Sequence, residues 1–261
     1  MINHSNFFGI VNVTPDSFSD GGEYFSPADA IQHGMNLFSD GVDILDIGAD
    51  STRPGSICVG HEEEWQRLEP VLKIVAPIGI TSVDTHNLKT AEKAIKLGVK
   101  IINDISGGSE EMFSLVAKAK VRYVLMYTKT KNAHQFEDQE KCSADEVLEN
   151  IVTFFRETLR EISRYDISEK QLILDPSLGR FLSSNPENSW HILKNIQVLQ
   201  EFGLPILLGI SRKGFVGGSN TQEKDTLSAI AALEVAKFAY SEPRLFFRVH
   251  NARVHHAVWG V

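Results

Sequence analysis

Short apolar runs alternate with longer segments of helical periodicity along the whole chain. The runs are rich in β-branched and aromatic residues, and they span three to seven positions. Strands that are covered on both faces read as continuous apolar runs of this kind. Eight segments fit the description: residues 7–13, 43–47, 78–83, 100–102, 123–126, 172–174, 206–208 and 245–247.

The segments between the runs carry apolar residues at i, i+3, i+4 and i+7, which is typical of amphipathic helices. We expect each such helix to turn these residues toward a core. The expected inward faces are Ile31, Gly34, Met35 and Phe38; Trp65, Leu68, Leu72 and Val75; Leu148, Ile151, Phe155, Leu159 and Ile162; and Leu227, Ile230, Ala231, Val235 and Phe238. The acidic run Glu62–Glu64 is interpreted as a solvated first helical turn.

Eight strand-then-helix units in 261 residues predict an α/β protein with a (β/α)8 TIM barrel. We expect one domain over residues 1–261, because no linker or shift in composition divides the chain. A doubly wound open sheet is the alternative, although that fold has no preference for eight units. The segments after the first, second, fifth, sixth and seventh runs are long and rich in Gly, Ser, Pro and charge, whereas segments before the runs, such as Asp40–Gly41 and Gly98–Val99, are short. Function is therefore expected at the carboxyl ends of the strands.

Polar residues gather at those strand ends. A lone Asp after a strand is commonly a turn former or a helix cap, but eight strand ends that converge on one mouth make the joint pattern informative. Asp84, Asn103 and Asp175 offer acceptors for a flat ligand with several N–H donors. The cationic residues Arg53, Lys213, Arg248 and His250 suit a phosphate or a carboxylate. Arg212–Lys213 is alternatively a solvated basic pair, and Asn12 is an oxygen donor suited to Mg²⁺ beside the anion.

The net charge of −8 argues against nucleic acid or an anionic membrane as a partner. An anionic ligand must then be held by local positive groups. The amino terminus does not read as a secretory signal, and no apolar run is long enough to span a bilayer. Cys58 and Cys142 have no metal-binding spacing, so we expect reduced thiols and a cytoplasmic location.

Several motifs resemble those of the dihydropteroate synthase family, in family order and over essentially the whole chain. They are GIVNVTPDSFSDGG at 9–22, DIGADSTRPG at 46–55, SVDT at 82–85, INDISGG at 102–108, LILDP at 172–176, GISRKGFVG at 209–217 and RVH at 248–250. The first two motifs are long and specific.

This resemblance implies a folate-pathway transferase on a TIM barrel. It would join 7,8-dihydropterin-6-ylmethyl pyrophosphate to 4-aminobenzoate and release pyrophosphate. The resemblance further implies dependence on Mg²⁺, a homodimer, and inhibition by sulfonamides.

The resemblance also assigns residues to parts of the reaction. The pterin side comprises Asp84, Asn103, Ile105, Met126, Asp175, Gly209 and Lys213. The pyrophosphate side comprises Asn12, Arg248 and His250, with Asn12 at the metal. The aminobenzoate side comprises Phe18, Thr52, Arg53, Lys213 and Gly214. The implied catalytic residues are Asp16, Arg53, Asp84 and Lys213.

Four positions depart from the family pattern. Tyr127 stands where the family has His, and Arg180 stands where a Phe lines the pocket. Gly214 replaces a Ser that meets the aminobenzoate carboxylate, and Asn251 replaces the Asp of RVHD. Arg180 either stacks like an aromatic ring or turns outward and leaves Phe181 to fill the space.

The departures keep two other functions open. One is a divergent pterin-binding protein that makes no product. The other is a pterin-dependent methyltransferase, although such enzymes do not require the SRK and STRPG segments that are present here. A purely structural protein would leave the converging charges unexplained.

Overall fold

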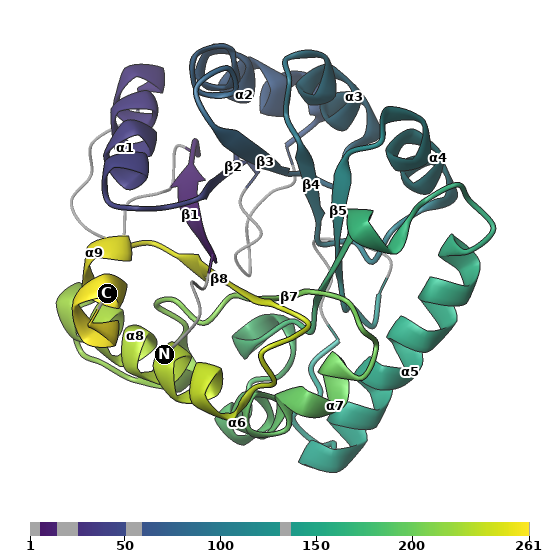
Figure 1. Ribbon diagram of the computed structural model, residues 1–261, viewed down its shortest axis with the longest axis vertical. Helices are drawn as coiled ribbons and strands as arrows, with labels where there is room; N and C mark the ends of the chain where they lie inside the picture. Colours follow the sequence, from purple (N-terminus) through teal and green to yellow (C-terminus); the bar gives the residue numbers. More distant parts are fainter. Residues whose placement is uncertain (1–5, 15–25, 51–58, 131–136, 261) are drawn as a thin grey trace.

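Eight parallel strands close into a barrel in chain order, with β1 paired to both β2 and β8 (Figure 1). The computed structural model describes residues 6–14, 26–50, 59–130 and 137–260. The barrel confirms the expected (β/α)8 architecture and excludes the open sheet. The strands are β1 Asn6–Asn12, β2 Ile44–Gly48, β3 Ile80–Asp84, β4 Ile101–Asp104, β5 Arg122–Met126, β6 Leu172–Asp175, β7 Ile206–Leu208 and β8 Leu245–Val249.

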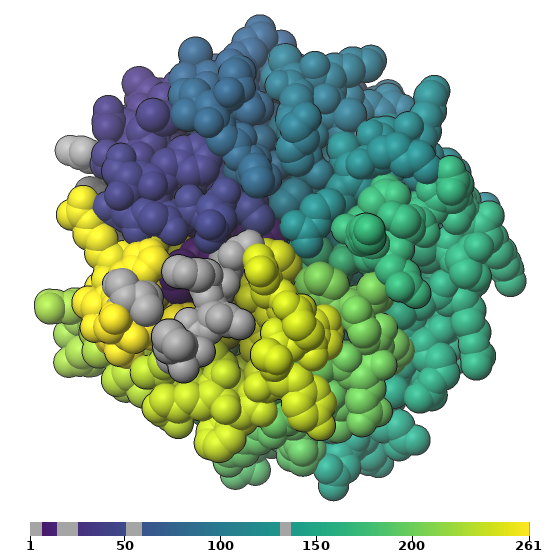
Figure 2. Space-filling model, viewed as in Figure 1, coloured from purple at the N-terminus to yellow at the C-terminus, as the bar shows by residue number. Residues whose placement is uncertain are grey.

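Helices surround the barrel on its outside (Figure 1). They are α1 Pro27–Ser39, α2 His61–Val75, α3 Leu88–Lys96, α4 Glu110–Ala119, α5 Ala144–Ile162, α6 Pro186–Lys194, α7 Ile196–Gln200, α8 Thr221–Phe238 and α9 Ala252–Trp259. Short 3₁₀ segments lie at Glu169–Gln171, Gly179–Phe181 and Gly214–Val216. In Figure 2 the chain-order colours follow one another around the rim, so that the carboxyl-terminal segments lie against the amino-terminal ones.

Local sequence signals explain where several helices begin. Ser26 and Asp29 form a reciprocal capping box before α1, with Pro27 in the first turn, and Ser143 and Glu146 do the same for α5. The turn between α1 and β2 is short because Gly41 adopts φ +87°, a backbone conformation that disfavours other residues.

The barrel interior has two layers, which follow from the two-residue period of a strand. One layer is apolar and takes a side chain from seven of the eight strands: Phe8, Ile44, Ile101, Val124, Ile173, Leu207 and Phe246. Two residues further along, nearer the carboxyl ends, the same strands present Ile10, Asp46, Asn103, Met126, Asp175, Gly209 and Arg248. The apolar layer therefore closes the barrel below a mouth that is mostly polar.

Two expectations about helix faces were wrong. On α8, Leu227, Ile230 and Phe238 are 38%, 43% and 61% exposed, because the helix packs its small residues against the barrel instead. On α2, Glu64 is buried rather than solvated, and its side chain accepts a hydrogen bond of 2.5 Å from Thr90. Glu64 lies one turn before Leu68 and therefore shares the inward face of the helix.

Candidate active site

The polar layer forms a connected cluster across the barrel mouth. Arg248 on β8 donates from Nε to Asp46 Oδ2 at 2.6 Å and from Nη2 to Asp84 Oδ2 at 2.8 Å. Asn103 on β4 donates from Nδ2 to the same Asp46 oxygen at 3.0 Å. These residues come from strands β2, β3, β4 and β8, so the contacts cross the interior rather than follow one pair of strands. The cluster holds its acceptors in fixed positions.

Sequence reasoning gave Asp46 no role. Its side chain is fully buried, and it anchors both Arg248 and Asn103. Among the described residues, the second carboxylate oxygen of Asp46 has no hydrogen-bond partner. The strand period could have identified Asp46 as an interior residue, because it lies two residues after Ile44 of the apolar layer.

Two carboxyl groups at the mouth, those of Asp84 and Asp175, have pKa values above that of an exposed aspartate. Burial raises the pKa of Asp84 to about 7, although the neighbouring Arg248 opposes the shift. Burial also raises the pKa of Asp175, against the opposing charge of Lys213. Asp84 therefore changes its charge near neutral pH, where a solvated aspartate stays ionised, and the pKa of Asp175 is shifted in the same direction.

Lys213 completes the mouth from the turn after β7. Its ammonium donates to the Leu178 carbonyl at 2.7 Å and lies 4.7 Å from the centre of the Phe181 ring. Burial lowers the pKa of Lys213 to about 8, and Asp175 opposes that change. A Cβ atom added to Gly209 would lie 3.8 Å from the ammonium, so the structure brings Gly209 and Lys213 together as expected.

An apolar surface lies in the same mouth. Ile105 and Met126 are buried, and the partly buried Phe181 packs against them. Together with Lys213 above the Phe181 ring, these side chains offer a flat surface beside the acceptor cluster. A planar heterocycle needs this combination of apolar faces and edge acceptors.

Arg180 takes the second of its two expected positions. Its side chain is exposed, and the next residue, Phe181, is the one that packs into the mouth. Gly214 is also exposed, and a Cβ added there would meet no atom within 4 Å among the described residues. The site therefore has an aromatic wall and sterically tolerates serine at position 214.

Tyr127 lies outside the mouth, because it follows Met126 and so points to the opposite face of the strand. Its hydroxyl donates to Gln139 Oε1 at 3.3 Å, and its ring centre lies 5.3 Å from that of Phe154. Burial raises the pKa of Tyr127 to about 12. This departure from the family pattern therefore changes packing behind the barrel and leaves the mouth unchanged.

His250 lies at the other side of the mouth, just beyond β8. Its Nδ1 lies 3.0 Å from Ser211 Oγ, and its backbone N–H donates to the same oxygen at 3.2 Å. Asn12 ends β1 with a half-buried side chain. In the described part of the chain, no cluster of three or more His, Cys, Asp or Glu residues could hold a metal ion. Asp16, Phe18, Thr52, Arg53 and Cys58 lie outside the described residues.

Comparisons with known proteins agree on one family. The model of the pterin binding enzymes matches residues 8–250. The type-3 dihydropteroate synthase of Escherichia coli is 37% identical over 253 residues, which are 95% of each protein. The dihydropteroate synthase of Mycobacterium leprae is 37% identical over 212 residues, covering 80% of this chain and 73% of the relative.

Comparison with solved structures identifies the same family. Dihydropteroate synthase from Xanthomonas albilineans, solved with 4-aminobenzoic acid, superposes with a TM-score of 0.85 at 30% identity, covering 99% of this chain and 92% of that one. The Anaplasma phagocytophilum enzyme with bound 6-hydroxymethylpterin-monophosphate gives a TM-score of 0.84 at 29% identity, covering 98% and 97% of the two chains. The chain is thus a pterin binding enzyme and belongs to the dihydropteroate synthases, a family of transferases.

Proposed function

We propose that this chain condenses 7,8-dihydropterin-6-ylmethyl pyrophosphate with 4-aminobenzoate to give dihydropteroate and pyrophosphate. The observation that carries the proposal is the buried acceptor cluster beside a cation and an aromatic wall, in a chain of this family. The cluster comprises Asp46, Asp84, Asn103 and Asp175, with Lys213 and Arg248 beside it.

The pterin ring fits the mouth by shape and by hydrogen bonding. Its amino and ring N–H groups need acceptors, which Asp84, Asp175 and the Asn103 carbonyl supply. Its flat faces need apolar contact, which Met126 and Phe181 supply. Water in the same place would have to satisfy the same buried acceptors, so the ring replaces solvent without leaving a polar group unpaired.

The chemical step needs charge stabilisation rather than a protein nucleophile. The C–O bond between the methylene and the pyrophosphate breaks, and its electron pair leaves with the pyrophosphate. Positive charge then develops on the methylene and the ring, where the carboxylates of Asp84 and Asp175 stabilise it. The arylamine nitrogen supplies the electron pair of the new C–N bond, and its proton passes to the pyrophosphate or to water.

The leaving group carries negative charge that the mouth must balance. His250 and Arg248 lie at that side, and Arg248 retains N–H donors beyond the two it gives to Asp46 and Asp84. Mg²⁺, when bound, would neutralise charge on the pyrophosphate oxygens. Asn12 supplies one oxygen donor, which suits an ion held mainly by phosphate and water. We assign Lys213 and Gly214 to the aminobenzoate carboxylate, as the family resemblance implies, and both lie after β7 at the edge of the mouth.

Assembly as a homodimer is also part of the proposal. Leu227, Ile230 and Phe238 on α8, with Tyr240 beyond its end, form an exposed apolar surface. A second copy would remove this surface from water. Size-exclusion chromatography with light scattering should give the mass of a dimer for the natural chain and of a monomer for Ile230→Asp. The described residues include no helix that meets the length and hydropathy of a membrane span, and a cytoplasmic location stays a prediction from sequence.

Pyrophosphate release by the purified chain tests the function. The assay contains the dihydropterin pyrophosphate, 4-aminobenzoate and Mg²⁺, and each is omitted in turn. Release that requires all three supports the synthase, and a sulfonamide should then compete with 4-aminobenzoate. Tight binding of the pterin pyrophosphate without release would instead support a pterin-binding protein that has lost its second substrate.

A further inference from the structure

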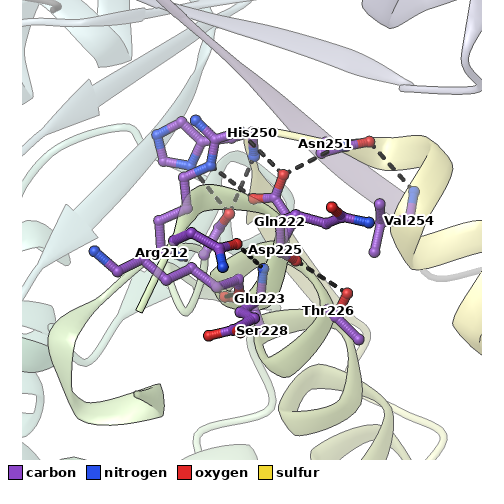
Figure 3. A network of polar contacts seen from close by, with 12 residues as sticks. Arg212, Gln222, Glu223, Asp225, Thr226, Ser228, His250, Asn251 and Val254 are labelled. Atoms are coloured by element: carbon purple, nitrogen blue, oxygen red, sulfur yellow. Dashed lines mark hydrogen bonds and ion pairs between the residues drawn. The ribbon is translucent and has the colours of Figure 1, made fainter. Parts of the chain in front are cut away.

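A buried carboxylate outside the barrel mouth connects two parts of the site. Asp225 lies in α8 and is 3% exposed. Its Oδ1 accepts from Arg212 Nε at 2.6 Å, and its Oδ2 accepts from Arg212 Nη2 at 3.0 Å and from Asn251 Nδ2 at 3.2 Å (Figure 3). The Arg212 pair is bidentate, which fixes the orientation of the guanidinium as well as its distance.

The two partners of Asp225 are direct neighbours of site residues. Arg212 precedes Lys213, and Asn251 follows His250. Ser211 completes the connection, since its hydroxyl contacts both Nδ1 and the backbone N–H of His250. One carboxylate therefore ties the turn that carries Lys213 to the strand end that carries His250.

The turn itself needs such support. Arg212 adopts φ +58°, a left-handed conformation that is uncommon for residues other than glycine. Its backbone N–H donates to Ser228 Oγ at 2.9 Å, and that hydroxyl donates its own proton to the Lys224 carbonyl at 2.6 Å. Helix α8 thus holds Arg212 at both its backbone and its side chain.

The side-chain amide of Asn251 is held in one orientation. Its Oδ1 accepts from the Val254 N–H at the start of α9, so only its Nδ2 is left to face Asp225 (Figure 3). The acceptor at position 225 therefore serves one charged and one neutral donor at once. Arg212 directs its charge to Asp225, so of the basic pair only Lys213 is turned to the mouth.

We propose that Asp225 is a positioning residue of the active site, which acts through Arg212 and Asn251 to hold Lys213 and His250 at a fixed separation. The proposal rests on the proposed function for its activity readout. It predicts that loss of the Asp225 charge impairs the use of both substrates, because His250 serves the dihydropterin pyrophosphate and Lys213 serves both that substrate and 4-aminobenzoate.

The test compares Asp225→Asn with a matched control. The substitution keeps size and one acceptor oxygen but removes the charge. The control is Asp40→Asn, which breaks a similar pair, Arg253 Nε to Asp40 Oδ1 at 2.6 Å, in the same pocket of about 440 Å³ that Arg212 and His250 line. We expect kcat/KM to fall roughly 10- to 100-fold in Asp225→Asn and less than about twofold in Asp40→Asn.

A swap separates positioning from general stability. In the double variant Asp225→Asn/Asn251→Asp, the carboxylate and the amide exchange places, so the hydrogen bond between positions 225 and 251 can still form. We expect kcat/KM of the double variant to be about fivefold higher than that of Asp225→Asn. Isothermal titration with the dihydropterin pyrophosphate gives a second readout that needs no turnover, and its affinity should fall and recover in parallel. The proposal is overturned if Asp225→Asn keeps the turnover and the affinity of the natural chain. It is also overturned if the double variant recovers the melting temperature but recovers neither turnover nor affinity. A natural chain without turnover would instead contradict the proposed function, with the affinity series still deciding the role of Asp225.

Discussion

The two sides of the barrel mouth are built in different ways. Asp46, Asp84 and Asn103 are on strands, and Asp46 and Asn103 each follow an apolar interior residue, Ile44 and Ile101, with the period of the strand. Lys213 is on a turn, and its place depends on Arg212, which is held by side chains of α8. The strand side is thus fixed by the main-chain ladder, while the turn side is fixed by a few side-chain hydrogen bonds.

This contrast has a consequence for substitutions. A change at a strand position leaves the backbone in place and removes only the chemical group. A change in the turn or its supports moves every group that the turn carries. We therefore expect a substitution on the strand side to remove the contribution of that one residue. We expect a substitution on the turn side to change the contributions of all residues that the turn carries.

The strongest test of the strand side is Asp84→Asn. Removal of this charge, which pairs with Arg248 and which we place nearest the developing cation, should lower kcat by about 10²- to 10³-fold, the range seen when one preorganised electrostatic group is lost. Steady-state kinetics measures the change, and circular dichroism checks that the barrel stays folded. Asp166→Asn, which breaks an exposed pair with Lys120, is the control and should keep natural kcat. Full turnover in Asp84→Asn would remove the proposed role.

Asp46→Asn tests whether the innermost carboxylate works through its neighbours. The amide cannot balance the Arg248 charge, so Arg248 and Asn103 should lose their fixed positions. We expect KM for the dihydropterin pyrophosphate to rise about tenfold, which corresponds to one charged hydrogen bond, with a smaller change in kcat. An unchanged KM would show that Asp46 supports folding alone.

The pH dependence of kcat/KM compares the two sides directly. Asp84, with a pKa of about 7, must lose its proton to act, so activity should rise through pH 7. Lys213, with a pKa of about 8, must keep its proton, so activity should fall above pH 8. The profile is therefore a narrow bell with limbs near these values. Lys213→Arg should move only the alkaline limb upward, and a flat profile from pH 6 to 9 would contradict both assignments.

The smallest effect is expected on the turn side, from Gly214→Ser. The added side chain meets no atom within 4 Å among the described residues, so it is free to reach the second substrate. We expect KM for 4-aminobenzoate to fall about threefold, less than one full hydrogen bond provides, with no change in KM for the pterin substrate. Arg180→Ala is the companion variant, and its exposed side chain should leave both constants unchanged. A higher KM in Gly214→Ser would mean that the serine disturbs the turn.

Sequence reasoning succeeded where chain periodicity sets the geometry. All eight strands were expected, with ends that differ by at most two residues, and the strand phase brings Asp84, Asn103 and Asp175 to one mouth. The same phase turns Tyr127 away from the mouth, although sequence reasoning counted Tyr127 among the departures that kept other functions open. The two-residue period of a strand and the closure of the barrel together determine which of these side chains face the interior. The sequence pattern alone is therefore enough to predict them.

It failed where tertiary packing decides. The α8 face was assigned by its large apolar residues, whereas the helix buries Ser228, Ala232 and the charged Asp225. No pattern around Asp225 marks it as buried, since it lies in a polar stretch and its partners are distant in sequence. Its role appears only when β7, β8 and α8 are assembled.

The apolar layer beneath the mouth also determines the order of events. Because side chains from seven strands fill the barrel there, ligands reach the polar layer only from the carboxyl ends of the strands. Under the proposed function the pterin ring lies against this layer, so we expect it to bind before 4-aminobenzoate, which would otherwise block its way. We expect the condensed product to leave on the same side. The apolar layer then sets the order of binding and release, a role separate from the chemistry of the polar residues above it.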